Sequence, residues 1–267
     1  MKVKLLELFG GVGACSMAFK NLNIPYEIVD YVEIDKYAVA SFNAINNTNF
    51  EPQDICEWDK DVEVDLIMHG SPCQDFSLAG KNAGGDKGSG TRSSLMYETI
   101  RIVDKLKPKF VIWENVKNLL SKKHIHNFDA YLNAMEQLGY KNYYQVLNAK
   151  DYGIPQNRER IFTISIRKDI EINFEFPPKQ ELKLKLKDLL EEEADEKYYL
   201  NDILICKNHF DEYIEVSEAT KKGYKEAYDG DSVNLEHPKS KTRRGRVGKQ
   251  VAQTLTTQCN QGVVVID

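Results

Sequence analysis

The clearest candidate for covalent chemistry is Cys73, which lies in the segment 70–77 with the sequence GSPCQDFS. This segment follows an apolar run at residues 64–69, and open α/β sheets bind their ligands at the carboxyl ends of parallel strands. Pro72 stiffens the turn, and backbone N–H groups there favour the thiolate, which a free thiol with a pKa of about 8.5 needs near neutrality. We interpret the other cysteines as small buried apolar residues: Cys15, Cys56, Cys206 and Cys259.

A carboxyl group that can work beside this cysteine belongs to Glu114. It directly follows the apolar run 110–113. Because consecutive parallel strands end on the same rim of a sheet, Glu114 can face Cys73 across the width of one small molecule. The neighbouring apolar Trp113 would help the carboxyl group to keep or gain a proton. The alternative interpretation of Glu114 is an acid that caps a helix.

Two guanidinium groups, those of Arg158 and Arg160, precede the apolar run 161–166. Residues at i and i+2 of an extended segment point to the same face, and such a pair suits a phosphate or a carbonyl oxygen. A structural network with Glu159 is an equally good interpretation for Arg158. The histidines form no cluster with metal-ligand spacing, so we assign no metal site.

A glycine turn at residues 10–13 lies between an apolar run and a helical pattern near the N-terminus. Such a turn lets the backbone approach a nucleotide-like ligand, although the third glycine of the dinucleotide fingerprint is absent and a plain structural turn is the alternative. Glu33 ends the second predicted strand, where an acid accepts the hydroxyl groups of a ribose. We expect Asp54 and Ile55 to reach an adenine from the end of a third short strand. The set indicates S-adenosylmethionine, which carries an adenosyl group without a pyrophosphate.

The elements that must position these residues follow from the apolar pattern. It predicts strands over 3–9, 27–32, 64–69, 110–113, 143–147 and 161–166, and helices over 14–22, 35–46, 94–106 and 128–138. This alternation predicts an α/β domain of Rossmann-like type, with a mostly parallel sheet and helices on both faces. Asp35 is predicted to cap its helix, and the glycine-rich segment 80–93 is predicted to be a mobile loop.

The character of the sequence changes around residues 177–178, which are both proline. We predict a catalytic and cofactor-binding domain over 1–170, a smaller domain over 171–243, and a return segment toward the first domain over 244–267. Residues 182–190 fit both a strand and the start of a helix, and the pattern does not decide between them.

The composition limits the class of protein. The 267 residues contain 36 Lys and Arg against 41 Asp and Glu, and the net charge of −5 argues against nucleic-acid binding through bulk charge but permits a local basic patch. A hydrophobic content of 42% supports a packed core. No apolar run is long enough to span a bilayer, and the cysteines lack paired spacing, so we expect a cytoplasmic protein without disulfides.

In its motifs the sequence resembles the cytosine-C5 DNA methyltransferases of bacteria and their phages. The matching segments follow the family order and are 8–13 (LFGGVG), 32–38 (VEIDKYA), 54–55 (DI), 70–77 (GSPCQDFS), 113–116 (WENV) and 151–160 (DYGIPQNRER), with 252–257 (AQTLTT) resembling a late motif. The resemblance implies that Cys73 attacks C6 of cytosine and that Glu114 binds N3 and the exocyclic amine and delivers a proton. It also implies that Arg160 holds the base near its O2, with Arg158 in support.

The resemblance implies the further parts of the machinery. The pocket of S-adenosylmethionine would be lined by Phe9, Gly11, Val12, Gly13, Glu33, Ile34, Asp54, Ile55 and Pro72. Thiolate addition at C6 would make C5 nucleophilic enough to attack the sulfonium methyl group, and a cytosine within a duplex must first be flipped out. The loop 80–93 would close over the base, the domain 171–243 would recognise the target sequence, and the basic run 241–249 would contact phosphates.

Two features depart from the family pattern. Ser71 stands where a proline is more usual, and the chain ends at Asp267 without the family's C-terminal Asn-Ser motif, so we expect a fragment or a need for a second polypeptide. We expect a monomer that acts on double-stranded DNA in the cytoplasm of a bacterial or phage-infected cell, at the nucleoid and without a membrane. A cognate restriction endonuclease stays an open partner. The alternatives are a tRNA cytosine-C5 methyltransferase of the same fold, an inactive truncated DNA-binding remnant and a nicotinamide dehydrogenase, which the missing third glycine disfavours.

Overall fold

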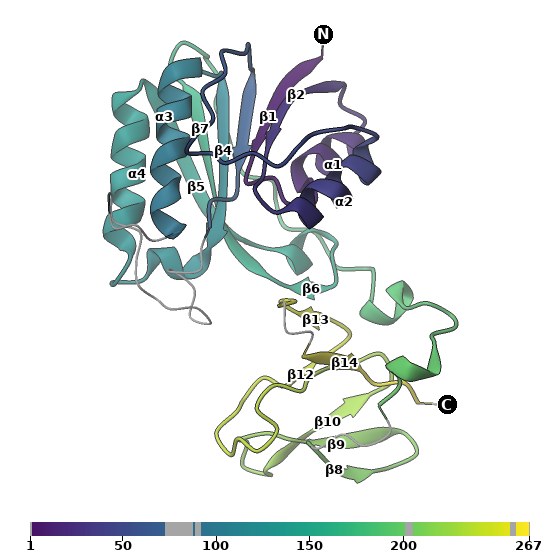
Figure 1. The fold of residues 1–267 in the computed structure, drawn as a ribbon. Helices are drawn as coiled ribbons and strands as arrows, with labels where there is room; N and C mark the ends of the chain where they lie inside the picture. Colours follow the sequence, from purple (N-terminus) through teal and green to yellow (C-terminus); the bar gives the residue numbers. More distant parts are fainter. Residues whose placement is uncertain (1, 73–87, 89–91, 201–204, 257–259, 267) are drawn as a thin grey trace. The chain divides into compact units, whose positions relative to one another are not determined.

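The computed structural model describes residues 2–72, 88, 92–200, 205–256 and 260–266 (Figure 1). The chain packs into two compact units, one of residues 1–147 and 160–176 and the other of residues 148–159 and 177–267. The break therefore falls between Phe176 and Pro177, six residues later than the 170/171 boundary expected from the sequence. Residues 244–267, expected as a separate return segment, group with the second unit.

The first unit is built on one six-stranded sheet with the strand order β2-β1-β3-β4-β7-β5. Its strands are β1 (Val3–Leu8), β2 (Tyr26–Val32), β3 (Leu66–His69), β4 (Phe110–Val116), β5 (Tyr140–Asn148) and β7 (Glu159–Arg167). The pairs β1–β2, β1–β3 and β3–β4 are parallel, whereas β7 runs antiparallel to β4. Three consecutive parallel pairs bring the carboxyl ends of β1, β2, β3 and β4 to one rim, as a Rossmann-like sheet requires.

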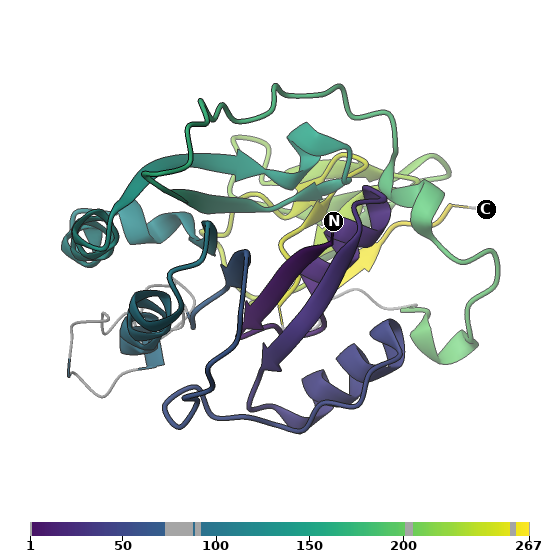
Figure 2. The ribbon, with the colours of Figure 1, turned by 90° about the horizontal axis from the view of Figure 1, so that it is seen from above.

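Helices cover both faces of this sheet. The helices are α1 (Ala14–Asn21), α2 (Lys36–Asn46), α3 (Met96–Leu106) and α4 (Ile125–Gln137). Figures 1 and 2 show α1 and α2 on one side of the sheet and α3 and α4 on the other. Adjacent residues of β1 confirm the two layers, because Leu5 packs in the cluster with Cys15 of α1, while Leu6 packs in the cluster with Ile102 of α3. Alternation along a strand thus supplies apolar side chains to both layers.

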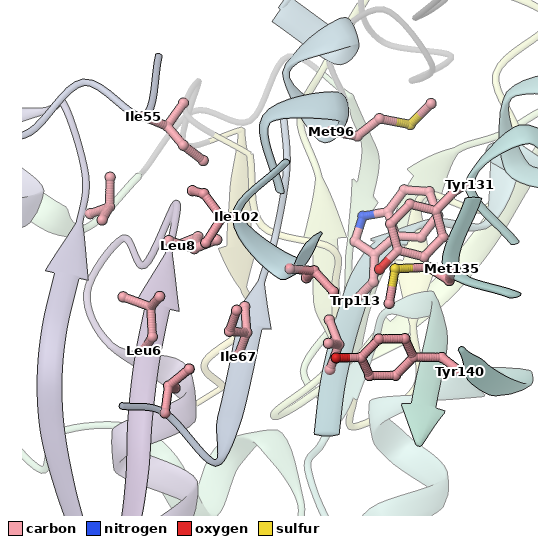
Figure 3. Close-up of a cluster of buried hydrophobic side chains, with 14 of the residues drawn as sticks. Leu6, Leu8, Ile55, Ile67, Met96, Ile102, Trp113, Tyr131, Met135 and Tyr140 are labelled. Carbon is pink, nitrogen blue, oxygen red and sulfur yellow. The ribbon is translucent and has the colours of Figure 1, made fainter. Parts of the chain in front are cut away.

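The larger of the two cores lies between the sheet and the helices α3 and α4. Figure 3 shows Leu6, Leu8 and Ile67 from the central strands facing Ile102. Tyr131 and Met135 from α4 lie beside the indole ring of Trp113, which is buried in the middle of β4. This core anchors the strand ends that carry the candidate site residues.

The second unit is built from short strands. One three-stranded antiparallel sheet contains β8 (Cys206–His209), β9 (Tyr213–Ser217) and β10 (Tyr224–Tyr228), and another contains β11 (Ser232–Asn234), β12 (Val247–Gly248) and β14 (Gln261–Val263). A parallel two-residue pair joins β6 (Gln156–Asn157) to β13 (Ala252–Gln253). Seven buried apolar residues, among them Ile205, Val216 and Val264, form its core. Such a small core needs polar support.

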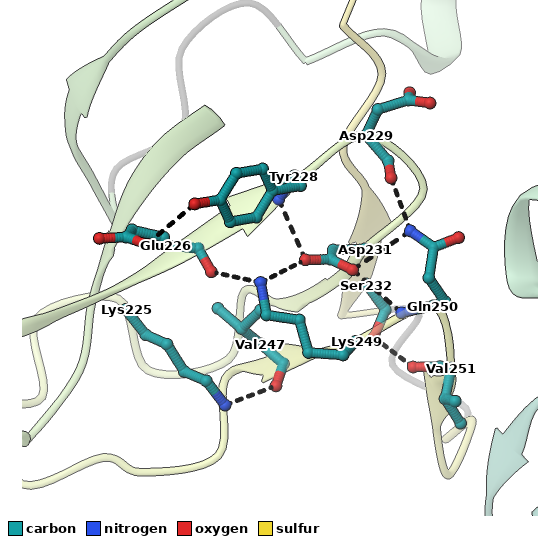
Figure 4. Close-up of polar contacts among 10 residues, drawn as sticks. All are labelled: Lys225, Glu226, Tyr228, Asp229, Asp231, Ser232, Val247, Lys249, Gln250 and Val251. Carbon is teal, nitrogen blue, oxygen red and sulfur yellow. Dashed lines mark hydrogen bonds and ion pairs between the residues drawn. The ribbon is translucent and has the colours of Figure 1, made fainter. Parts of the chain in front are cut away.

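That support centres on Asp231, which is buried at a turn before β11 (Figure 4). Its carboxylate accepts a hydrogen bond from Lys249 Nζ at 2.8 Å and another from the backbone N–H of Gln250 at 3.0 Å. The backbone N–H of Tyr228 donates to the same carboxylate at 3.0 Å. One acid therefore ties the end of β10 to the segment that follows β12.

Several local expectations are corrected by the structure. Glu114 lies inside β4 rather than after it, because the strand continues to Val116 through pairing with β7. Residues 54–55 belong to a loop and turn rather than to the end of a strand, and Cys56, expected to be buried, is exposed. Residues 186–189 form a short 3-10 helix. The expected loop 80–93 lies almost entirely outside the described residues.

Across the ranges that the structure describes, none of the helices combines the length and the apolar character needed to cross a membrane.

Candidate active site

The glycine turn between β1 and α1 is shaped by two large aromatic rings. A Cβ atom added to Gly10 would lie 2.5 Å from the ring of Tyr31, and one added to Gly13 would lie 2.7 Å from the ring of Phe42. Gly13 also has a φ angle of +88°, which disfavours any residue with a side chain. Glycine is therefore required at these two positions by packing and by backbone conformation.

Gly11 differs from its neighbours, because it faces open space. Its φ angle is +54°, and a Cβ atom added to it would meet nothing within 4 Å. Phe9, just before the turn, also has a positive φ angle of 53°. Val12 is exposed. The backbone at Gly11 is thus bare and accessible, which is what close approach of an adenosyl ligand needs.

Glu33 lies directly after β2 and bridges two backbone segments. Its Oε2 accepts a hydrogen bond from the N–H of Gly11 at 3.1 Å, and its Oε1 accepts one from the N–H of Asp35 at 2.9 Å. Asp35 caps α2 as expected, since its carboxylate accepts from the N–H groups of Tyr37 and Ala38. The acid expected to bind a ribose therefore lies against the glycine turn, and the side chain of Ile34 beside it is 67% exposed.

The segment with Asp54 and Ile55 is attached to the same strand end. The N–H of Gln53 donates to the backbone carbonyl of Glu33 at 2.8 Å. Ile55 is buried in the large core, whereas the exposed Asp54 accepts from the N–H of Cys56 at 2.9 Å. The structure thus brings Gly11, Glu33 and the 53–55 segment together at the ends of β1 and β2.

Asp30 holds this segment in place, and sequence reasoning missed it. The carboxylate accepts hydrogen bonds from the indole N–H of Trp58 at 2.8 Å, from Lys60 at 2.8 Å and from the amide of Gln53 at 3.0 Å. Burial acts to raise the pKa of Asp30, but the hydrogen bonds, with that of Lys60 foremost, outweigh it and lower the pKa. The signal in the sequence was an acid directly between the apolar residues Val29 and Tyr31 of the predicted strand.

A second missed acid, Glu7, lies under the glycine turn. Its side chain is only 2% exposed, and Oε1 accepts a hydrogen bond from the N–H of Ser16 at 3.1 Å. Gly13, the N-terminal cap residue of α1, has no side chain to offer the first turn of the helix. Glu7 supplies that cap from β1, and burial raises its pKa to about 7.

The second half of the site is formed by Glu114 and Arg160. Arg160 Nε lies 3.0 Å from Glu114 Oε1, across the antiparallel pair β4–β7, where Val116 is the register partner of Arg160. A Cβ atom added to Gly70 would lie 3.8 Å from Glu114 Oε2. The carboxylate of Glu114 is therefore paired with a guanidinium and lies beside the chain that leaves β3 toward residue 73.

The segment between β3 and Cys73 is described as far as Pro72. Ser71 is 2% exposed, and Pro72 is half-buried. Cys73 itself lies outside the described residues, so its predicted proximity to Glu114 stays a prediction. Arg158 is half-buried and belongs to the second unit, where its N–H donates to Asn148 Oδ1 at 3.1 Å, whereas Arg160 belongs to the first unit.

The basic run 241–249 differs from the expected row of phosphate contacts. Arg246 is fully buried, and its guanidinium donates to the backbone carbonyls of Asn234, Glu236 and His237 at 2.7–3.0 Å. The expectation that Arg246 contacts phosphates is therefore wrong, because this side chain holds a turn together. Arg243 pairs with Glu236 at 2.7 Å, and Lys249 pairs with Asp231. Lys241 and Arg244 are exposed.

No group of three or more His, Cys, Asp or Glu side chains that could hold a metal ion occurs in the described ranges. The arrangement instead offers two adjoining sites on one rim. One site is a bare glycine turn with an acid and suits an adenosyl group, and the other is a carboxylate–guanidinium pair and suits a planar polar base. The mostly parallel sheet, with β7 inserted antiparallel, is the Rossmann-like fold of the S-adenosylmethionine-dependent methyltransferases.

Comparison with known proteins agrees with this class and narrows it. Residues 3–265 match the family model of the C-5 cytosine-specific DNA methylases, and the chain belongs to this family. It is 35% identical over 255 residues to the type II methyltransferase M2.ScrFI of Lactococcus lactis subsp. cremoris, covering 75% of this chain and 71% of that protein. It is 35% identical over 234 residues to the orphan methyltransferase M.SPRI of Bacillus phage SPR, covering 75% of this chain and 53% of that protein.

Solved structures share the fold. A DNMT2 variant from Spodoptera frugiperda matches with a TM-score of 0.65 and 20% identity, over 92% of this chain and 74% of that one. A prophage-encoded DNA modification methyltransferase from E. coli matches with a TM-score of 0.59 and 24% identity, over 81% of this chain and 60% of that one. Both similarities bear on the fold alone.

Proposed function

We propose that this chain transfers a methyl group from S-adenosylmethionine to C5 of a cytosine in double-stranded DNA. The observation that carries the proposal is the Glu114–Arg160 pair at 3.0 Å, which lies beside Gly70, a residue of the segment that leads to Cys73. Family membership supports the same reaction, and M2.ScrFI and M.SPRI are methyltransferases by name.

The residues of the cofactor site fit an adenosyl ligand. The open space at Gly11 leaves room for its close approach, and the carboxylate of Glu33 is an acceptor for ribose hydroxyl groups. When bound, S-adenosylmethionine supplies an electrophilic methyl group. We assign the walls of this site to the residues expected from the sequence: Phe9, Gly11, Val12, Gly13, Glu33, Ile34, Asp54, Ile55 and Pro72.

The residues of the base site would act on cytosine in sequence. The thiolate of Cys73 would add to C6, while Glu114 would hydrogen-bond N3 and the exocyclic amine and pass N3 a proton taken up from solvent, so that the electron pair of the C5–C6 bond is left at C5. Arg160 would donate to O2 and keep the carboxyl group of Glu114 aligned, with Arg158 in support. C5 would then take the methyl group as its bond to the sulfonium sulfur breaks, leaving S-adenosylhomocysteine. A base would remove the C5 proton, the C6–S bond would break to release the thiolate, and N3 would return its proton to Glu114, which restores the aromatic ring.

We propose that the second unit recognises the DNA sequence, chiefly through residues 171–243. One support is the separate packing of this unit. Another is that Lys241 and Arg244 are exposed and suit contacts with phosphates, whereas Arg243 and Lys249 form ion pairs with Glu236 and Asp231. We propose that the chain acts as a monomer, at the nucleoid and in the cytoplasm of a bacterial or phage-infected cell. The base-site pair lies within one unit of a single chain, which supports the monomer. A cognate restriction endonuclease stays open as a partner, since M2.ScrFI is named a type II methyltransferase and M.SPRI an orphan methyltransferase.

The deciding experiment offers the chain radiolabelled S-adenosylmethionine with either a pool of duplex DNA or tRNA. We expect label in 5-methylcytosine of the DNA, and bisulfite sequencing of DNA from cells that express the chain should place it in one short sequence. Label in tRNA alone would move the substrate to RNA. Binding of DNA without any methyl transfer would show the inactive remnant instead. Cleavage of unmethylated DNA alone by an extract of the source cells would establish the paired endonuclease.

A further inference from the structure

Ser71 carries a contact that the more usual proline at this position cannot make. Its Oγ accepts a hydrogen bond from the indole N–H of Trp113 at 3.0 Å, and its backbone carbonyl accepts one from the side-chain amide of Asn115 at 3.3 Å. Both contacts are buried. Ser71 is thus tied to β4 by the two residues that flank Glu114 in the sequence.

Trp113 is a firm anchor for this contact. Its side chain is 1% exposed, and its ring centroid lies 4.1 Å from that of Tyr131 and 5.7 Å from that of His69, whose ring is nearly parallel to the indole at 4°. His69 Nε2 in turn shares a hydrogen bond with the hydroxyl of Tyr131 at 3.0 Å. The indole therefore has one place to lie, and its N–H has a fixed direction.

Glu114 points away from this aromatic layer, because neighbouring residues of a strand face opposite sides. Trp113 and Asn115 are buried on one side of β4, whereas Glu114 is partly exposed on the other, beside Gly70 and Arg160. The chain that leaves β3 consequently lies beside Glu114 at Gly70 and is hydrogen-bonded to Trp113 and Asn115 at Ser71. In the sequence only Pro72 separates Ser71 from Cys73.

We propose that Ser71 is a positioning residue for the proposed reaction, which through Trp113 holds the chain leaving β3 at a fixed place against the strand that carries Glu114. This inference rests on the proposed function, in which Cys73 and Glu114 act on one cytosine. Ser71 does not touch the substrate. It holds the backbone two residues before the nucleophile Cys73, and a misplacement of a reacting group by about 1 Å can cost about a hundredfold in rate.

The test uses the full chain, S-adenosylmethionine and a duplex with 5-fluorocytosine at the methylated position found by bisulfite sequencing. The fluorine cannot leave as a proton, so the covalent adduct persists. Its final amount counts the folded active molecules, and its rate of formation reports the geometry of the site. We compare the chain with Ser71→Ala and Trp113→Phe, and with Ser232→Ala as the matched control. Ser232 is equally buried and its Oγ donates to the backbone carbonyl of Val251 at 2.7 Å, but it belongs to the second unit.

We expect Ser71→Ala and Trp113→Phe each to slow adduct formation about ten- to a hundredfold with the adduct amount per folded molecule unchanged. Ser232→Ala should lower the melting temperature without slowing the adduct. A merely structural Ser71 would lower the amount of adduct and leave its rate as in the unaltered chain, and this result would overturn the proposal. If the unaltered chain forms no adduct at all, the proposed function fails, and the role of Ser71 fails with it.

Discussion

Burial of Glu7 beneath the glycine turn should make the stability of the first unit depend on pH. The carboxyl group is 2% exposed, and burial raises its pKa from 4.5 to about 7. Between these two values the folded chain holds a proton that the unfolded chain has released. The free energy of unfolding therefore has its full contribution from Glu7 below pH 4.5 and loses it as the pH rises to about 7.

The size of this effect follows from the two pKa values. One pKa unit corresponds to about 1.36 kcal/mol, so the rise from 4.5 to about 7 amounts to about 3 kcal/mol. Glu7→Gln stays neutral at every pH and keeps an oxygen that can accept from the N–H of Ser16. The difference in unfolding free energy between the variant and the unaltered chain should therefore move by about 3 kcal/mol in favour of glutamine across this range.

The assay is urea unfolding followed by tryptophan fluorescence. Both tryptophans, Trp58 and Trp113, are buried in the first unit, so the signal reports the unit that contains Glu7. His69 adds an opposite slope, since burial lowers its pKa to about 3 and its contribution is lost as the pH falls below 6.5. That slope is common to both proteins and cancels in the difference. Glu27→Gln, at an exposed position of β2, is the control for removing an acid. A difference that stays constant within about 1 kcal/mol from pH 4.5 to pH 7 would refute the reasoning.

The remaining predictions concern the two halves of the site and the second unit. Glu33→Ala should weaken S-adenosylmethionine binding about tenfold or more, because a charged acceptor is lost, and unchanged affinity by calorimetry would remove Glu33 from the cofactor site. Glu114→Gln should keep DNA binding but slow methyl transfer roughly a hundred- to ten-thousandfold, and a rate near that of the unaltered chain would exclude it as the proton donor. Arg246→Ala should lower the melting temperature, since three backbone carbonyls lose their buried donor, whereas Arg244→Ala should instead weaken binding to all DNA sequences alike and reduce its salt dependence. Grafting residues 171–243 into a related methyltransferase should transfer the methylated sequence, and methylation at the recipient's own sequence would place recognition elsewhere.

The alternating elements of the first unit were predictable because their cause is local. Apolar runs with turn residues between them define a buried strand or a helix whatever else the chain does, so β1, β2 and α2 with its Asp35 cap follow from the sequence. The antiparallel direction of β7 was not predictable in this way, because it depends on pairing with β4 rather than on the residues of β7. The second unit was predicted least well, since its strands are only two to five residues long and carry too few residues for a period to show.

The site was predictable where a residue type is rare for its surroundings. Glu33 and Glu114 are acids at the ends of apolar runs, and the structure places both on the expected rim. The prediction that the basic run 241–249 contacts phosphates was wrong for Arg246, because a sequence shows how many cations a segment has but not which groups they bind. Arg246 is bound by carbonyl oxygens, which any sequence provides, and only the path of the backbone decides whether they converge on one guanidinium.

The supporting residues share one physical feature, which explains both why they were missed and why they matter. Glu7, Asp30 and Ser71 are polar groups buried within or beside apolar strands, where an unpaired polar atom would cost about 1–3 kcal/mol. Each is paired with a segment of the site: Glu7 with the start of α1, Asp30 with the 53–60 segment, and Ser71 with the strand of Glu114. Since an apolar residue would fill the same space without a polar partner, these positions constrain the site's geometry more than they add to the core. The positions of the site residues at the rim of this sheet therefore depend on the buried polar contacts of Glu7, Asp30 and Ser71.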